Sequence, residues 1–96
     1  MKNKINSLLN DFEKGSLKDT ETLSKIISLF GEKNLPFLLS SLLTKNEIKS
    51  FVNRLLIIKK LKEEQNQHAI ADKLKVGVAT ITRGSNELSQ GKFDFM

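Results

Sequence analysis

The sequence contains no cysteine, and its 96 residues include a single histidine and a single proline. Without cysteine the chain can form no disulfide, zinc–thiolate site or thiol nucleophile, which fits a reducing cytoplasm. No apolar run approaches the roughly 20 residues that a membrane-spanning helix needs, and no signal-peptide pattern opens the chain. We therefore expect a cytoplasmic protein with no membrane partner.

Catalytic and metal-binding groups are equally scarce. His68, the one histidine, is expected at the surface or near a phosphate and not as a catalytic base. The acidic residues are scattered, with neither the paired carboxylates of acid–base catalysis nor the spacing of metal ligands. No glycine-containing turn matches a nucleotide-binding loop. The sequence thus predicts no enzyme, no catalytic residue, no metal and no cofactor.

Positive charge is in mild excess. The formal net charge is +5, and residues 54–96 hold eight Lys/Arg against five acids. This balance is compatible with a nucleic-acid partner but does not by itself indicate one. The apolar share of 39% is enough for a core, although a short, nearly all-helical chain often completes its core by dimerising.

The first 14 residues are predicted to form an amphipathic helix that Gly15 ends. Both charge signs occur on its polar face, so we expect it to dock on the protein and not on a membrane surface. Its apolar face consists of Ile5, Leu8, Leu9 and Phe12.

A second helix is predicted to begin at Asp19 or Thr20, whose side chains can cap a helix N-terminus, and to end at Gly31 or Asn34. Residues 35–43 follow as the most apolar stretch, with five leucines and a phenylalanine in nine positions. Such a segment has almost no polar face. We expect a short helix that is buried against other helices, of this chain or of a second copy.

The longest predicted helix runs from a capping box to about Glu63. Thr44 at the N-cap and Glu47 three positions later can each bond the other's backbone amide. Apolar residues cover more than one face, so we expect neighbours on at least two sides. Arg54 lies in the middle, and its position alone leaves open whether it is a surface arginine with a buried stem.

Residues 67–74 and 78–88 are predicted to form two short helices joined by a tight turn, the pattern of a DNA-binding helix-turn-helix. Asn66 can cap the first helix, Ala71 allows a close crossing, and Gly77 should supply an unusual backbone conformation in the turn. The residues expected to face the core are Ala69, Ile70, Leu74, Val78 and Ile81.

The second short helix has side chains suited to reading DNA. Gly77, Val78 and Ala79 let its backbone approach a groove closely, and free amides at a helix N-terminus can bind a phosphate. Thr80 and Thr82 offer a hydroxyl and a methyl group to bases or bridging water. Threonine is a mediocre helix former, so an exposed helix that binds nothing explains this pair poorly.

Residues 79–86 resemble the tryptophan repressor family of bacteria. Their sequence is Ala-Thr-Ile-Thr-Arg-Gly-Ser-Asn, and the resemblance extends over roughly residues 17–88. It implies an intertwined, all-helical homodimer whose two reading heads enter successive major grooves of double-stranded operator DNA. It also implies a small amino-acid ligand, L-tryptophan, that binds as corepressor between the core and the reading head.

The resemblance implies residues for both sites. Arg54 and Arg83 would sandwich the flat ring of the ligand, Thr44 and Arg83 would hold its carboxylate, and Gly84 would leave room for the ring. The backbone around residues 41–43 of the second copy would take the ammonium. The implied ligand-binding residues are Ser41, Leu43, Thr44, Arg54, Arg83, Gly84 and Glu87. The implied DNA-binding residues are Gln67, His68, Gly77, Val78, Ala79, Thr80, Thr82 and Arg83.

Three features depart from the family pattern. His68 stands where the family commonly carries an arginine, and a neutral imidazole there would attract phosphate less. Glu87 replaces a serine near the ligand ammonium, and it could strengthen an amine contact or point into solvent. The family's final helix is expected to be missing or reduced to a stub in residues 89–96, in a space that residues 1–14 could fill.

We therefore predict one all-α domain, with a dimerisation core in residues 1–63, a helix-turn-helix in residues 66–88 and a tail in residues 89–96. The predicted function is sequence-specific transcriptional repression activated by L-tryptophan. Two alternatives stay open. One is a regulator of the same fold that responds to another small molecule or to none, and the other is a helical protein-interaction module.

Overall fold

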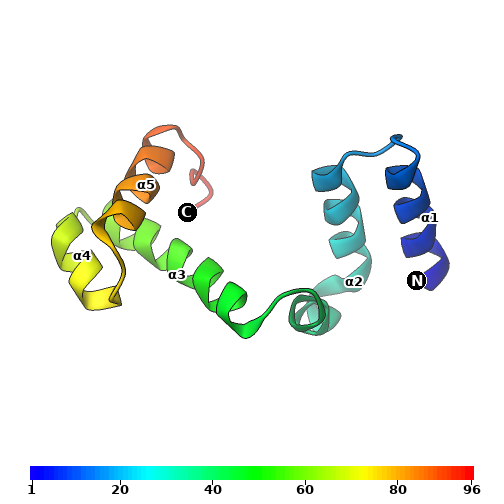
Figure 1. Cartoon of the computed structure of the whole chain (residues 1–96), viewed down its shortest axis with the longest axis horizontal. Coiled ribbons are helices and arrows are strands. Elements are labelled where there is room, and N and C mark those ends of the chain that lie inside the picture. Colours follow the sequence, from blue (N-terminus) through cyan, green and yellow to red (C-terminus); the bar gives the residue numbers. More distant parts are fainter. The chain divides into compact units, whose positions relative to one another are not determined.

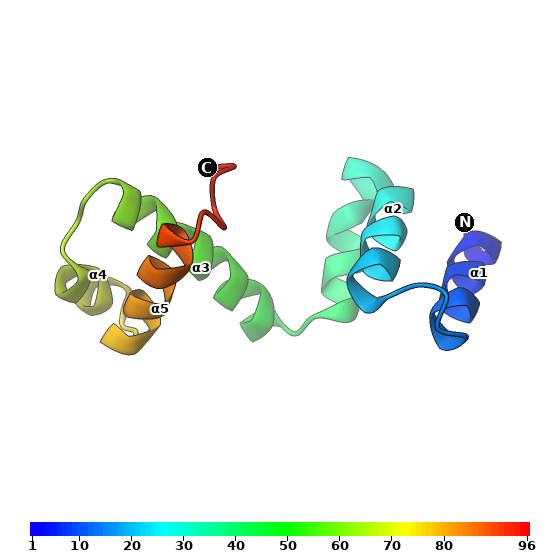
Figure 2. The same ribbon diagram turned by 90° about the horizontal axis from the view of Figure 1, so that it is seen from above.

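The computed structural model describes all 96 residues, which form five helices and no strands. The predicted all-α fold class is thus confirmed. The chain packs as two compact units, residues 1–44 and residues 45–96 (Figure 1, Figure 2). The helices are α1 (Lys2–Glu13), α2 (Asp19–Leu42), α3 (Lys45–Lys62), α4 (Gln67–Leu74) and α5 (Val78–Ser89).

No single helix has both the length and the apolar composition to cross a membrane.

The first unit consists of α1 packed against α2. Gly15 follows the end of α1 with a φ of +86°, as expected of a glycine that stops a helix. The predicted cap of α2 is wrong, because Lys18 is the N-cap and Asp19 is already helical. Oδ1 of Asp19 accepts a hydrogen bond from the Thr20 amide at 2.7 Å. The carboxylate therefore still satisfies a free amide at the start of the helix.

α2 is interrupted at Gly31, where φ is 69° and ψ is 169°. Glycine adopts this backbone at little cost, so the predicted helix end falls at the right residue. The apolar segment 35–43 then forms most of the second half of α2. Within one chain, however, Phe37 is 73% exposed and Leu42 is 58% exposed, and only Leu38 of this segment is buried. The packing of α1 against α2 within residues 1–44 thus leaves most of this segment uncovered.

In the second unit, α3, α4 and α5 pack around a small apolar core. Ile58, Ile70 and Ile81 are fully buried there, one from each helix. Ala69 and Val78 were predicted to face this core but are exposed. On α4 the buried residues begin at Ile70, one position later than predicted. On α5 the first buried residue is Ile81. The buried residues of the two short helices are Ile70, Ala71, Ile81 and Gly84.

The N-terminal cap of α4 agrees with the prediction from the sequence, whereas the turn after its C-terminus does not. Oδ1 of Asn66 accepts hydrogen bonds from the amides of His68 (2.9 Å) and Ala69 (3.2 Å), as predicted for the cap. In the turn, Gly77 has ordinary extended backbone, so the unusual conformation predicted for it is wrong. Lys75 adopts it instead, with φ 56° and ψ 46°. This left-handed conformation costs a lysine about 1 kcal/mol or more, so packing of the helices must hold the turn.

The C-terminal residues after α5 lie against the end of α3. Lys62 Nζ donates hydrogen bonds to the carbonyl oxygens of Phe93 (2.9 Å) and Met96 (2.5 Å). The rings of Phe93 and Phe95 are 5.8 Å apart between centroids, and Phe95 is largely exposed.

Candidate functional site

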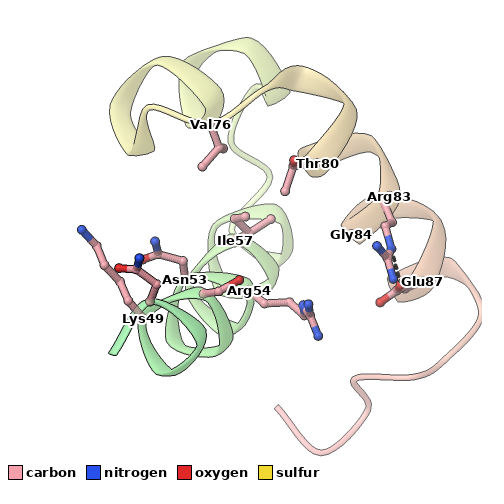
Figure 3. Close-up of a pocket in the computed structure, with 11 residues that line it drawn as sticks. Lys49, Asn53, Arg54, Ile57, Val76, Thr80, Arg83, Gly84 and Glu87 are labelled. Carbon is pink, nitrogen blue, oxygen red and sulfur yellow. Dashed lines mark hydrogen bonds and ion pairs between the residues drawn. The ribbon is translucent and has the colours of Figure 1, made fainter. Parts of the chain in front are cut away.

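A cavity of about 360 Å³ lies between α3 and α5, entirely within residues 45–96 (Figure 3). Ile57 of α3 and Val76 of the turn give it apolar walls. The polar and charged residues that α3 contributes are Asn46, Lys49, Ser50, Asn53 and Arg54. The residues that α5 contributes are Thr80, Arg83, Gly84 and Glu87.

Arg54 reaches the cavity because it shares a helical face with Ile57, three positions further along α3. Its guanidinium carbon lies 5.4 Å from the centroid of the Phe51 ring, within the range of a cation–π contact. Figure 3 shows the Arg54 side chain extending towards the part of α5 that carries Arg83 and Glu87. Charged groups from two helices therefore border one apolar cavity.

Arg83 and Glu87 form an ion pair one turn apart on α5. Nε of Arg83 donates to Oε1 of Glu87 at 3.1 Å (Figure 3). The two side chains differ in exposure, because Arg83 is 75% accessible and Glu87 only 22%. The Glu87 carboxylate thus lies on the cavity wall beside Arg83. This residue, which departs from the family pattern, does not point freely into solvent.

At Gly84, α5 lies close to side chains of α3. A Cβ atom at this residue would lie 3.3 Å from Ile57 Cγ2, 3.6 Å from Ile58 Cδ1 and 3.7 Å from Leu61 Cδ1. A hydrogen atom there lets the two helices meet, which the sequence resemblance had explained only as room for a ligand ring. A Cβ atom at this position would be in tight contact with Ile57, so a larger side chain is expected to displace either α5 or the isoleucine.

The predicted DNA-binding residues lie on the surface of α4, α5 and the turn between them. Seven of the eight are exposed, and Gln67 is half-buried. Thr82 Oγ1 donates to Gln67 Oε1 at 3.2 Å, so these two side chains, fifteen positions apart, meet across the two helices. Thr80 and Arg83 are predicted DNA-binding residues that also border the cavity.

Positive charge gathers in the unit that carries α4 and α5. Residues 45–96 hold ten Lys/Arg against six acids, which gives +4 of the chain's net +5. The pKa of Lys60 is held below its ordinary value by desolvation, and further by the nearby ammonium of Lys73. The end of α3 and the end of α4 thus bring like charges together, and a bound anion would relieve their repulsion.

Three of the predicted ligand residues, Ser41, Leu43 and Thr44, belong to residues 1–44 and do not line this cavity. Their contribution from a second copy stays a prediction. In turn, Asn53 and Lys49 line the cavity without having been predicted. Asn53 and Lys49 lie four and eight positions before Ile57 on α3, and this helical spacing was the available signal. No group of three or more His, Asp or Glu side chains could hold a metal ion.

Comparisons with known proteins match most of the chain to one family. The family described as Trp repressor protein matches residues 19–96. A Trp operon repressor homolog of Vibrio vulnificus is 47% identical over 58 residues, which are 59% of this chain and 57% of that protein. A Trp operon repressor homolog of Vibrio campbellii is 41% identical over 73 residues, 74% of this chain and 73% of that protein.

A Trp operon repressor homolog of Vibrio parahaemolyticus is 50% identical over 52 residues, 53% of this chain and 50% of that protein. The match therefore spans little more than half the length of several curated relatives. No solved structure matches the chain.

Proposed function

The chain belongs to the Trp repressor family, and from this premise we propose that it is a DNA-binding transcriptional repressor with L-tryptophan as its corepressor. The cavity between α3 and α5 carries the ligand proposal, because Arg54 and Arg83 border it together with the apolar Ile57. Guanidinium groups can both bind a carboxylate and stack on a flat ring. A volume of about 360 Å³ also suits a small aromatic ligand.

The DNA proposal rests on α4 and α5, which would act as a helix-turn-helix with α5 as the recognition helix. The N-terminal residues of α5 are small and exposed, so its backbone can approach a groove. Thr82 presents a hydroxyl and a methyl group on the same helix, and its bond to Gln67 would orient both side chains towards the DNA. The net positive charge of residues 45–96 favours the phosphate backbone. A DNA target also fits the predicted cytoplasmic location.

A homodimer is part of the proposal, because apolar residues of α2 are left uncovered in one copy. Phe37 and Leu42 are largely exposed. A groove of about 370 Å³ between α1 and α2 is lined almost wholly by apolar side chains, apart from Asp19 and Thr22. Interfaces of obligate homodimers are of this apolar kind. Two copies would carry two recognition helices, with the spacing of about one DNA turn, roughly 34 Å, that the family implies.

Ligand and DNA would be coupled through α5. This helix forms one wall of the cavity and also carries the predicted base-reading residues, so a ligand between α3 and α5 would favour one position of the recognition helix. Ligand binding would then shift the population of α5 positions. The shift can be only as large as the difference in the ligand's affinity for those positions.

The test is a titration of the full chain with L-tryptophan and with duplex DNA. The chain has no tryptophan of its own, so the fluorescence of the ligand reports its binding directly. We expect saturable tryptophan binding, DNA binding at low salt that weakens steeply as salt rises, and tighter DNA binding when tryptophan is present. Absence of DNA binding at low salt would refute the DNA proposal, and absence of saturable tryptophan binding would refute the corepressor proposal.

Replacement of His68 by arginine is expected to strengthen DNA binding at pH 8. The residue is exposed at the start of α4, and a permanent positive charge there adds one phosphate contact in each copy. The slope of log K against log salt should steepen by about 0.9 for each added contact. Fluorescence anisotropy of labelled duplex DNA over a salt series measures this slope.

The control for His68→Arg is Asn10→Arg, which adds the same charge on the exposed face of α1. A position outside the DNA interface should leave the slope unchanged. Equal steepening by both variants would show that net charge, and not a contact at His68, is responsible.

A further inference from the structure

Lys49 is a cation on the cavity wall that belongs neither to the predicted ligand residues nor to the predicted DNA-binding residues. It is exposed near the start of α3 and takes part in neither the Lys59–Glu63 nor the Arg83–Glu87 ion pair. We propose that Lys49 binds a phosphate of the DNA backbone, so that α3 extends the DNA interface beyond the helix-turn-helix. This inference rests on the proposed DNA function and adds a contact to it.

Lys49 borders the same cavity as the start of the proposed recognition helix. Val76 of the turn and Thr80 in the first turn of α5 line the cavity with it. In Figure 3 the Lys49 side chain extends from α3 on the side of Val76, and away from Arg83 and Glu87. The charge of Lys49 is thus on the side of the turn that leads into α5, where the helix would enter a groove.

The two sides of α5 face different helices. On one side Thr82 donates to Gln67 of α4 at 3.2 Å, and on the other side Thr80 borders the cavity and α3. A recognition helix in the major groove has a phosphate backbone on each side, and residues next to the helix contact these backbones. With α4 against one backbone, α3 would face the other. Lys49 supplies a positive charge on that side.

A role in binding the ligand explains the position of Lys49 less well. The proposed ligand lies between Arg54 and Arg83, and Figure 3 shows Arg54 extending towards Arg83 while Lys49 extends the other way. No carboxylate neighbours the Lys49 ammonium on the cavity wall, because the side chains around it there are neutral, namely Asn46, Ser50 and Asn53. A compact charge on a flexible stem suits a phosphate that approaches from outside the protein.

Lys49→Gln tests the contact, because glutamine stays polar and removes the charge. With L-tryptophan at saturation, the slope of log K against log salt should become shallower by about 0.9 for each copy bound. The loss of affinity should be largest at low salt and vanish towards about 1 M salt, where counterion release contributes little. A phosphate contact carries no sequence information, so two labelled duplexes of unrelated sequence should lose affinity equally. Fluorescence anisotropy over a salt series measures these quantities.

Two variants serve as controls. Lys49→Arg keeps the positive charge and should keep the wild-type slope. Lys59→Gln removes an exposed charge of the same helix outside the cavity, and it should also leave the slope unchanged.

The outcomes separate this contact from the proposed DNA function. An unchanged slope in Lys49→Gln, or an equal change in Lys59→Gln, would overturn the contact and leave the DNA function intact. Weaker binding of L-tryptophan as the only effect of Lys49→Gln would assign the residue to the ligand site instead. A wild-type protein that binds neither duplex at low salt would overturn the DNA function and this inference with it.

Discussion

Arg54→Ala is expected to lower the affinity for L-tryptophan by about a hundredfold. The side chain borders the cavity from α3, opposite Arg83 on α5, and it is the only arginine that α3 contributes to the cavity. Its loss removes both a charged donor and a stacking surface for the ring, which together are worth about 3 kcal/mol. Ligand fluorescence measures the affinity, and sedimentation should show that the oligomeric state is unchanged.

The matched control for Arg54→Ala is Lys59→Ala, which removes an exposed cation of the same helix outside the cavity. It should bind tryptophan as the wild type does. Arg54→Lys tests the contribution of the planar guanidinium, because lysine keeps the charge but cannot stack or bond in the same way. Wild-type affinity in Arg54→Ala would contradict the assignment of the cavity as the tryptophan site.

Gly84→Val is expected to lower the free energy of unfolding by about 2 kcal/mol. The first atom of the new side chain would already lie 3.3 Å from Ile57 Cγ2 and 3.6 Å from Ile58 Cδ1, and both isoleucines are buried. Because the Cβ atom alone is already in tight contact, the two further methyl groups are expected to displace α5 or the isoleucines. The melting temperature should fall by about 10 °C at fixed protein concentration, as measured by circular dichroism.

The control for Gly84→Val must carry the same cost of a β-branched residue in a helix. Asn86→Val places valine at an exposed position two residues further along α5 and should change the melting temperature by at most a few degrees. Displacement of α5 should also weaken tryptophan binding in Gly84→Val alone. Equal effects of the two variants on stability would show that the close approach to Ile57 is not what requires glycine.

Helix boundaries in residues 45–96 were predictable because their signals are local. Asn66 caps α4 with its own side chain, and apolar spacing determines the lengths of α3 and α5. The errors arose where packing outweighs local preference. Lys75 takes the left-handed conformation that a glycine would favour, while Gly77 two positions later is extended. Sequence reasoning assigns such a conformation to the nearest glycine, whereas the path from α4 to α5 determines which residue adopts it.

The candidate site was only partly predictable. Arg54, Arg83, Gly84 and Glu87 were identified by resemblance, and the structure places all four on one cavity. The pairing of Arg83 with Glu87 could have been expected from their spacing of four positions. The contact of Gly84 with the isoleucines of α3 could not, because it depends on where two helices cross.

Lys75 leaves room for substitutions on α5, the proposed recognition helix. Its left-handed backbone, with φ 56°, makes the turn less stable than a glycine turn by about 1 kcal/mol or more. Natural proteins are only slightly more stable than their function requires. A substitution that stabilises the fold therefore often decides whether a second, destabilising substitution is tolerated. A change of lysine to glycine at this position is such a substitution, next to the helix that would read DNA. A lineage that acquires it could accept new side chains on α5, and with them, under the proposed function, new operators, while retaining the fold.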